Sequence, residues 1–319
     1  MRKLLRGLYK KRLNRVMAKR ELTDLSFSAM VFAPHPDDET LGCGGTILRK
    51  KAAGARVYIV FVTDGSRSHE GLIPEAALKA RRQQEALQAA QMLGVGPEDV
   101  IFLGFGDGRL TQAVNEAIGE ASMPGESNVL TQVQSLLATY TPDEVFVPHP
   151  EDRLADHTAT YRVAIAALQS LPPERAQSIA VYAYPIWYWR HWPWTPLGGN
   201  GKREMLNILK ATVRNGLGTA VFEDFQHSVY VGEVRSQKQA ALAMHISQMQ
   251  RPDSIPNWSI LSDVAGGDFL DCAMQDYEIF HSPQGVFSQP IENKQIPQQI
   301  SQQIPQQISQ QPFGEVVSP

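Results

Sequence analysis

The fold of this chain is decided by the stretch AMVFAPHPDDETLGCGGTIL at residues 29–48. An apolar run of strand length leads into a polar loop that lies between Pro34 and Pro36, each of which locks its own φ angle. The glycine-rich segment at residues 42–45 predicts a tight turn, and the apolar residues after it begin a helical pattern. Because open α/β sheets bind ligands at the carboxyl ends of their strands, we expect residues 34–39 to hold the functional site.

This loop contains one imidazole and three carboxylates. His35 and Asp38 are three residues apart, so a ring nitrogen and a carboxylate oxygen can converge on one divalent cation such as Zn²⁺. Asp37 would lie beside the cation and act as a general base on a bound water molecule. The alternative is an acidic, solvated loop, which the two flanking prolines disfavour.

A third ligand is expected from the loop PHPEDRLADH at residues 148–157. This loop follows a strand-like run at residues 144–147, and it is bracketed by His149 and His157. His157 immediately precedes a helical pattern over residues 158–168. The two loops should therefore meet at the same edge of a parallel sheet. Two histidines and three acids in one loop favour a ligand over a merely exposed segment.

Alternating patterns predict the rest of the fold. Strand-like runs occur at residues 30–33, 57–62, 100–103 and 145–147, and helical patterns at residues 46–53, 75–93 and 127–138. This alternation predicts an α/β fold with a Rossmann-like, mostly parallel open sheet, in a three-layer α/β/α arrangement with a small added β element. The glycines at residues 42–45 lack the spacing of a dinucleotide-binding fingerprint. Residues 63–65 should line the same crevice as the two loops.

These motifs resemble those of the PIG-L/LmbE family of metal-dependent de-N-acetylases. The first loop is similar to the family's (P/A)-H-P-D-D-E motif, and Asp156-His157 match the last two positions of its H-P-D-H motif. The resemblance runs from about Met30 to about Phe280. Its weaker matches, in the family's order, are an R-x-x-E helix at residues 82–85, an F-L-x-D-G-like segment at 102–108, a K-x-x-A-x-x-x-H/Y-x-S-Q helix at 238–248 and an E-x-F strand at 278–280.

The resemblance implies a hydrolase that removes an N-acetyl group from an N-acetylglucosamine-containing conjugate by attack of metal-bound water. Its metal ligands would be His35, Asp38 and His157, and its general base would be Asp37. Arg82 and Asp107 match positions that bind polar groups of the substrate. Zn²⁺ is the expected metal, although two nitrogens and a carboxylate also suit Fe²⁺ or Mn²⁺.

The chain departs from the family pattern at Leu154, where the H-P-D-H motif has a histidine that assists the oxyanion or the leaving group. His149 is expected to take this role from the same loop as a substrate-binding residue, or the metal acts without such help. Two other functions stay open: a deacylase of another small metabolite or glycopeptide, and a non-catalytic glycan- or membrane-binding module of the same fold. Retention of Asp37 favours an enzyme, whereas Leu154 favours the module.

Two further segments are typical of proteins that bind membrane surfaces. Residues 1–20 contain nine Lys or Arg and no acid, whereas the rest of the chain has 21 basic and 33 acidic residues, a net charge of −12. Four of the five tryptophans lie at residues 187–194. A basic amphipathic segment at residues 1–25 and exposed aromatic rings would suit anionic lipid, and hence a glycolipid or lipid-linked substrate. The alternatives are a solvated leader, a helix packed on the acidic body, and an aromatic mini-core.

Composition indicates one large α/β domain, which we expect at residues 26–283: the chain has 319 residues, 43% of them hydrophobic, and a net charge of −3. The two cysteines are too few for a disulfide framework and indicate a reducing, cytoplasmic location. Cys43 is expected to be a packing residue. No apolar run has the length of a membrane span, and no signal-peptide core follows the basic start. An acidic domain would repel nucleic acid.

The C-terminal third carries weaker signals. Residues 196–232 are expected to form a lid or a hairpin beside the site. Residues 238–250 should form a helix, on which His245 would be exposed or near the mouth of the site. Residues 284–319 repeat Gln, Pro, Ile and Ser, a composition typical of a disordered tail.

Overall fold

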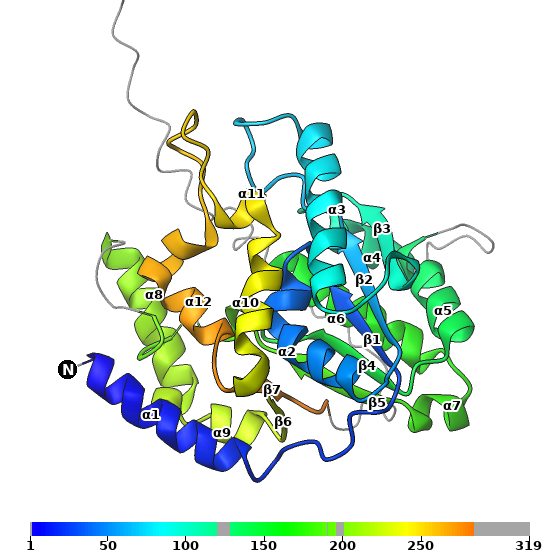
Figure 1. Cartoon of the computed structure of the whole chain (residues 1–319), viewed down its shortest axis with the longest axis horizontal. Coiled ribbons are helices and arrows are strands. Elements are labelled where there is room, and N and C mark those ends of the chain that lie inside the picture. Colours follow the sequence, from blue (N-terminus) through cyan, green and yellow to red (C-terminus); the bar gives the residue numbers. More distant parts are fainter. Residues whose placement is uncertain (1, 120–127, 190, 196–200, 284–319) are drawn as a thin grey trace, which may run out of the picture.

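In a computed structural model, the predicted strand-like runs form one parallel sheet (Figure 1). The structure describes residues 2–119, 128–189, 191–195 and 201–283. The sheet has the order β3-β2-β1-β4-β5, and all of its neighbouring strands are parallel. Its strands are β1 (Ala29–Ala33), β2 (Val57–Thr63), β3 (Val100–Phe105), β4 (Glu144–Pro148) and β5 (Ala180–Tyr184). The predicted Rossmann-like α/β class is confirmed.

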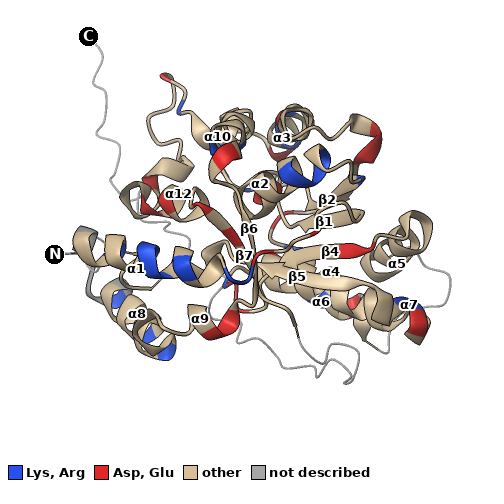
Figure 2. Cartoon of the chain, turned by 60° about the horizontal axis from the view of Figure 1, so that its bottom comes forward, with Lys and Arg blue, Asp and Glu red and all other residues tan. Residues whose placement is uncertain are grey.

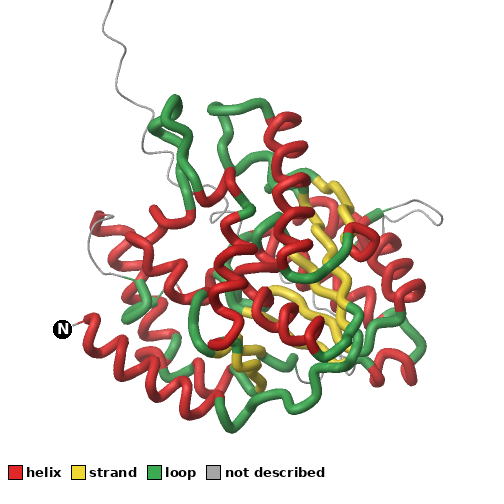
Figure 3. Tube along the Cα trace, in the orientation of Figure 1, coloured by secondary structure: helices red, strands yellow, loops and turns green. Residues whose placement is uncertain are grey.

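Each face of the sheet is covered by helices and has its own apolar core (Figures 1 and 3). One core includes Val31 and Ile59 and packs on α2 (Asp38–Ala52), α3 (Glu75–Met92) and α10 (Arg235–Ala243). The other core includes Met30 and Val60 and packs on α4 (Leu110–Ile118), α5 (Val129–Tyr140) and α6 (Ala155–Gln169). Successive strand residues point to opposite faces, and both faces are buried, which explains the continuously apolar strand sequences.

The strand order determines where a site can form. From β1 the chain continues to β2 and β3 on one side, and then crosses to β4 on the other side. The carboxyl ends of β1 and β4 therefore flank the point at which the strand order reverses, where open α/β sheets bind ligands. The two histidine-containing loops follow these two strands.

The predicted added β element is a two-stranded antiparallel sheet of β6 (His227–Tyr230) and β7 (Tyr277–Phe280). A bridge between Ala183 and His281 joins it to β5. The prediction of a lid or hairpin at residues 196–232 is wrong for most of the residues that the structure describes there. They are mostly helical, because residues 202–214 contain many good helix formers. The helices there are α8 (Gly201–Arg214), η3 (Gly216–Gly218) and α9 (Val221–Asp224).

The remaining helical elements are short connections and additions around this frame. They are η1 (Pro97–Asp99), α7 (Pro173–Ser178), η2 (Trp187–Trp189), η4 (Gly232–Val234), α11 (Ile246–Met249), η5 (Leu261–Gly267) and α12 (Asp268–Ala273).

The glycines at residues 42–45 do not form the predicted turn but lie inside α2. A Cβ atom on Gly42 would lie 2.3 Å from the Tyr184 ring, and one on Gly45 would lie 2.5 Å from Cβ of Val231. The glycines therefore let α2 approach its neighbours closely, and this packing rather than a turn explains them. Cys43 is fully buried between them, as expected for a packing residue.

Residues 2–17 form helix α1 (Arg2–Met17), which packs on the body of the protein. Its Leu13 and Met17 are buried in a third apolar cluster together with Tyr188, Trp189 and Trp194. The aromatic segment is thus largely a mini-core, and the expected exposure of Trp189 and Trp194 is wrong. Among the described residues, no helix combines the length and apolar character that crossing a membrane requires. The tail at residues 284–319 lies outside the described residues, and the domain boundaries stay predictions.

Candidate active site

The three predicted metal ligands come together at the carboxyl ends of β1 and β4. His35 follows β1, Asp38 begins α2, and His157 lies in the first turn of α6. Oδ2 of Asp38 lies 3.1 Å from Nδ1 of His35 and 3.3 Å from Nε2 of His157. One ligand atom of each residue lies within 4.8 Å of the others, so the group could hold one metal ion.

The donor atoms of this cluster fit a divalent cation. Nε2 of His157 is buried and has no hydrogen-bond partner among the described residues, although it faces Asp38. Nδ1 of the same ring lies 2.9 Å from Oδ2 of Asp152, a contact that holds a histidine in place with Nε2 as the ligand atom. Two imidazoles and one carboxylate form a ligand set typical of catalytic metals, but they do not select among Zn²⁺, Fe²⁺ and Mn²⁺.

The electrostatics of the cluster also favour a cation. Burial alone would lower the pKa of His157, but the carboxylates of Asp38 and Asp152 outweigh burial and raise this pKa to about 9. Burial alone would raise the pKa of Asp38, but His157 and His35 hold it well below its usual range. Ionised carboxylates that favour protonated imidazoles also favour a metal ion in place of those protons.

Asp37, the predicted general base, has an unusual backbone conformation beside the cluster. Its φ angle is 136°, which residues other than glycine rarely adopt. Its backbone N–H donates to Oε2 of Glu39 at 3.0 Å, and its carboxylate lies 3.3 Å from Nη2 of Arg82. Burial raises the pKa of Asp37 to about 6, against the opposing effect of Arg82. A carboxyl group with such a pKa is suited to proton transfer near neutral pH.

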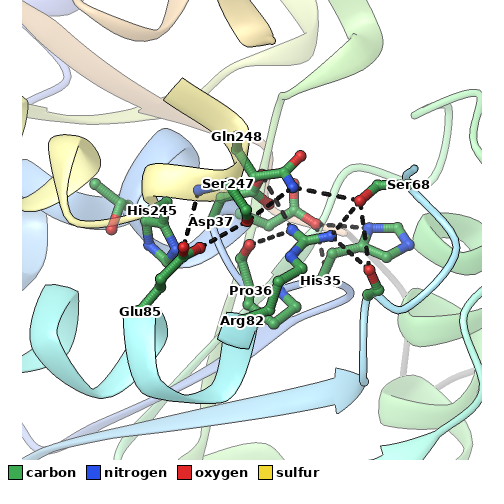
Figure 4. Close-up of polar contacts among 12 residues, drawn as sticks. His35, Pro36, Asp37, Ser68, Arg82, Glu85, His245, Ser247 and Gln248 are labelled. Carbon is green, nitrogen blue, oxygen red and sulfur yellow. Dashed lines mark hydrogen bonds and ion pairs between the residues drawn. The ribbon is translucent and has the colours of Figure 1, made fainter. Parts of the chain in front are cut away.

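Arg82 is buried behind the loop rather than exposed towards a substrate (Figure 4). Its guanidinium donates to the carbonyl oxygens of Gly65 and Pro36 and pairs with Asp37. A Cβ atom on Gly65 would lie 2.4 Å from this guanidinium, which explains a glycine here at a φ of 60°. These contacts make Arg82 a support for the loop, and its contact with a substrate stays a prediction.

Asp107 and Asp156 flank the other ring nitrogen of His35. Nε2 of His35 lies 3.4 Å from Oδ1 of Asp107 and 3.3 Å from Oδ2 of Asp156. Burial alone would raise the pKa of Asp107, but His35 outweighs burial and lowers it. The structure thus brings the predicted Asp107 to the cluster together with Asp156, to which the sequence pattern assigned no role.

His149 lies on the same loop as His157, but the structure does not bring it into the cluster. Its ring packs against Tyr188, Phe225 and His281, with ring centroids 5.0–5.3 Å apart. Burial, and then the nearby His281, lower the pKa of His149 to about 3. Its role as the replacement for the histidine absent at Leu154 stays a prediction that these contacts do not favour.

Two residues to which the sequence pattern assigned no role complete the surroundings of Asp37. His245, expected to be exposed or near the mouth, is fully buried, with Nε2 2.9 Å from Oε1 of Glu39. Glu39 is also fully buried and accepts the backbone N–H of Asp37. Of the two expected positions of His245, the exposed one is wrong. The helical segment breaks between α10 and α11, where His245 has a φ of −76° and a ψ of 62°. The sequence signal that could have indicated a role for His245 is its place at the His/Tyr position of the family motif at residues 238–248.

The break between α10 and α11 is held by residues of another family motif (Figure 4). The backbone N–H and hydroxyl of Ser247 donate to the Glu85 carboxylate at 2.9 and 2.6 Å. Gln248 reaches Ser68, whose hydroxyl also lies 3.4 Å from Nη1 of Arg82. The R-x-x-E and S-Q motifs therefore bind one another and support the loop that carries Asp37.

Comparison with known proteins is consistent with this geometry. The class defined by the fold and the site is an α/β protein with a His/Asp cluster at the reversal of strand order. Residues 30–168 match the family model PIG-L, GlcNAc-PI de-N-acetylase. Residues 30–168 therefore form a PIG-L family domain, as the motifs predict. N,N'-diacetylchitobiose deacetylase from Pyrococcus horikoshii shares the fold, with a TM-score of 0.53 and 20% identity over 91% of this chain and 96% of that chain.

Two curated relatives are also deacetylases. The 1D-myo-inositol 2-acetamido-2-deoxy-alpha-D-glucopyranoside deacetylase of Kribbella flavida is 30% identical over 203 residues, which are 55% of this chain and 64% of the relative. The diacetylchitobiose deacetylase of Thermococcus kodakarensis is 28% identical over 167 residues, which are 47% of this chain and 57% of the relative. The matched stretches span less than two thirds of either relative.

Proposed function

We propose that this protein is a metal-dependent hydrolase that removes the N-acetyl group from an amino-sugar conjugate. The observation that carries this proposal is the convergence of His35, Asp38 and His157, with Asp37 held beside them. The names of the two relatives describe substrates with an acetamido group on a sugar, which supports the same substrate class here. A lipid-linked amino sugar belongs to this class.

His35, Asp38 and His157 would hold the cation. When bound, it supplies Lewis acidity, which polarises the acetyl carbonyl and lowers the pKa of water. The Asp37 carboxylate accepts a proton from the attacking water as the new C–O bond forms. It then returns this proton to the amide nitrogen as the C–N bond breaks, so the products are acetate and a free amine. Because His149 lies outside the cluster, Asp37 is the candidate for both proton transfers.

The residues around Asp37 keep the proton acceptor in place. Arg82 pairs with its carboxylate, and Glu39 accepts its backbone N–H. Positioning of this kind matters because a misplacement of 1 Å can slow an enzyme by about 100-fold. Asp107 borders the cluster and is about 14% exposed, and we assign it to a hydroxyl or amide group of the sugar.

Metal content and acetate release from the full-length protein test this function together. Asp37→Asn should keep the metal and lose acetate release by a factor of about 100 or more, because the proton acceptor is removed. His157→Ala should lose the metal and the activity together. His227→Gln, a histidine change on β6, is the matched control and should behave as the wild type. Full activity of Asp37→Asn, or no acetate from any N-acetylglucosamine conjugate by metal-loaded protein, would overturn the proposal.

The same assay decides the role of His149. The geometry predicts that His149→Asn keeps both the metal and most of the acetate release. A large loss of acetate release with the metal retained would instead assign His149 to the function of the histidine absent at Leu154.

A further inference from the structure

The exposed apolar side chains of the molecule are concentrated on two helices. Of the twelve large apolar side chains that are exposed among the described residues, eight lie on α1, on α8 or in η3 directly after α8. The most exposed are Leu4, Val213 and Leu217, at 69%, 70% and 68%. Single exposed apolar residues are ordinary on a protein surface, but such a concentration is typical of an interaction surface.

The two helices belong to the same end of the molecule. The Tyr9 hydroxyl of α1 donates to the carbonyl oxygen of Gly218, just after α8. The Tyr9 ring also packs on Phe222 of α9, with centroids 5.4 Å apart. Figures 1 and 2 both show α1 and α8 together at this end of the protein. We refer to the exposed sides of α1 and α8 as the α1–α8 surface.

The aromatic mini-core orients α1. Leu13 and Met17 pack on Trp189 and Trp194 from the inner side of the helix. Arg6 and Lys10 lie over the Trp194 ring, 5.2 and 5.9 Å from its centroid. The opposite side of the helix, which carries Leu4 and Leu8, is therefore exposed. The tryptophans thus support the surface from beneath instead of forming it.

Helix α8 divides its exposed side into two stripes. Leu206, Leu209 and Val213 are spaced at i, i+3 and i+7 and form an apolar stripe. Arg203, Lys210 and Arg214 form a basic stripe next to it. The buried positions of the helix, such as Ile208, Ala211 and Thr212, point to the body of the protein. Both stripes are therefore available to a partner.

The charge of the surface indicates an anionic partner. At the exposed positions of α1 and α8 that the structure describes, charged residues are Lys or Arg only, including Lys11 and Arg15 on α1 (Figure 2). A two-fold dimer through this surface would bring the basic residues of two copies together, which is unfavourable. Nucleic acid would pair with the cations but would leave the leucines without a partner. An anionic lipid surface satisfies both, because its headgroups pair with cations and its acyl region accepts leucines.

We propose that the α1–α8 surface binds a membrane that contains anionic lipids, and that the protein lies on this membrane. In this arrangement the leucines and cations of α1 and α8 contact the membrane, and the tryptophans do not. It does not depend on the catalytic site. If the proposed deacetylase function also holds, the surface would bring the enzyme to lipid-linked amino sugars.

Co-sedimentation of the full-length protein with vesicles tests the proposal. The protein should sediment with phosphatidylcholine/phosphatidylserine vesicles, should stay in solution with phosphatidylcholine alone, and should dissociate as salt increases. The charge variant Lys210→Gln/Arg214→Gln should weaken binding about 30-fold, since each of the two cations near an anionic surface contributes about 1 kcal/mol and 1.4 kcal/mol corresponds to a factor of about ten. The apolar variant Leu206→Ser/Leu209→Ser/Val213→Ser should weaken it at least as much. Leu72→Ser/Met92→Ser, which changes two exposed apolar residues elsewhere, is the matched control and should bind as the wild type.

Two measurements keep the outcomes distinct. Thermal unfolding by circular dichroism shows that each variant is folded, and acetate release from a soluble N-acetylglucosamine conjugate should be unchanged. Light scattering reports the oligomeric state. Wild-type protein that stays in solution with phosphatidylserine vesicles at low salt would overturn the proposal. Vesicle binding that both surface variants retain would also overturn it. The same holds if the wild-type protein binds no vesicles but forms a dimer that the apolar variant dissociates and the charge variant does not.

Discussion

At the scale of single residues, Asp37 shows how neighbours determine the properties of a side chain. Its positive φ angle costs of the order of 1–3 kcal/mol and persists only where surrounding contacts enforce it. Here Glu39 accepts its backbone N–H, and Arg82 binds both its carboxylate and the preceding carbonyl group. His245 in turn binds Glu39. We therefore regard Glu39, Arg82 and His245 as positioning residues for Asp37.

Removal of the His245 imidazole should slow acetate release without loss of metal. In His245→Ala, Oε1 of Glu39 loses the imidazole and keeps the Thr40 hydroxyl as a donor, so the hold of Glu39 on the Asp37 backbone loosens and kcat should fall about 10- to 100-fold. His245→Gln keeps an N–H donor and should recover part of this loss. Steady-state kinetics and metal analysis check both variants, and KM should change little. Equal losses in the two variants, or loss of metal, would contradict a positioning role.

His149 should make the stability of the protein depend on pH. Its pKa is about 3 when folded, against about 6.5 when unfolded, so only the unfolded state binds its proton between these values. This contribution to stability is complete above pH 6.5 and is lost as the pH falls towards 3. At 1.36 kcal/mol per pH unit, the loss from pH 7 to pH 5 is about 2 kcal/mol.

The variant His149→Phe should therefore lose about 2 kcal/mol less of its free energy of unfolding than the wild type over the same pH interval. Urea unfolding at pH 7 and pH 5 measures this difference. A chelator in both samples prevents metal binding from adding its own pH dependence. Parallel losses in variant and wild type would show that His149 does not carry the effect.

At the scale of elements, α2 links the site to the rest of the fold. Its first turn carries Asp38 and Glu39, and its glycines allow close contact with Tyr184 and Val231. Gly42 and Gly45 lie about one and two turns after Asp38. The position of the carboxylates therefore depends on how closely α2 packs at these two glycines.

A single methyl group on this glycine face should destabilise the protein. In Gly45→Ala the new Cβ atom would meet Val231, so we expect the free energy of unfolding to fall by about 1–3 kcal/mol or more. Gly7→Ala on α1 is the control, since a Cβ atom added there would meet no other atom within 4 Å. This control should be neutral or stabilising by up to about 1 kcal/mol. Urea unfolding of both variants measures the effect, and a Gly45→Ala protein as stable as the wild type would refute the packing role.

At the scale of the whole molecule, a buried charge pair joins the sheet domain to the C-terminal elements. Nζ of Lys238 on α10 donates to Leu41, Ala273 and Glu278 at 2.9, 2.7 and 2.7 Å. Glu278 on β7 accepts the backbone N–H groups of Gly45 and Thr46 of α2. The lysine and glutamate of two family motifs are therefore structural partners, and four elements meet at them.

Loss of one partner of this pair should cost more than loss of both charges. Lys238→Met leaves the Glu278 carboxylate buried without its counter-charge and should reduce the free energy of unfolding by about 3–5 kcal/mol. Addition of Glu278→Gln should restore part of this loss, because a neutral amide needs no counter-charge. Urea unfolding of the two single variants and the double variant measures the coupling. Losses that simply add would contradict a coupled pair.

Much of the fold and of the candidate site could be predicted from local patterns. The apolar runs of β1, β2, β3 and β4 lie close to their predicted positions, because buried parallel strands are apolar on both faces. The cluster of His35, Asp38 and His157 followed from two short loops and their motifs. The helix α8 could not be predicted because the glycines around it resemble turn signals, and the glycines of α2 are misleading for the same reason.

The sequence by itself determined the parallel α/β fold, the chemistry of the two loops, and the presence of a basic N-terminal segment. These features depend on residues that are close in the chain. Only the tertiary structure decided that His149 packs among aromatic rings outside the cluster, that Trp189 and Trp194 are buried, and that His245 reaches Glu39 across 206 residues of chain. The physical reason is that a periodic pattern reports which face of an element is buried, whereas a contact between distant residues depends on how whole elements pack.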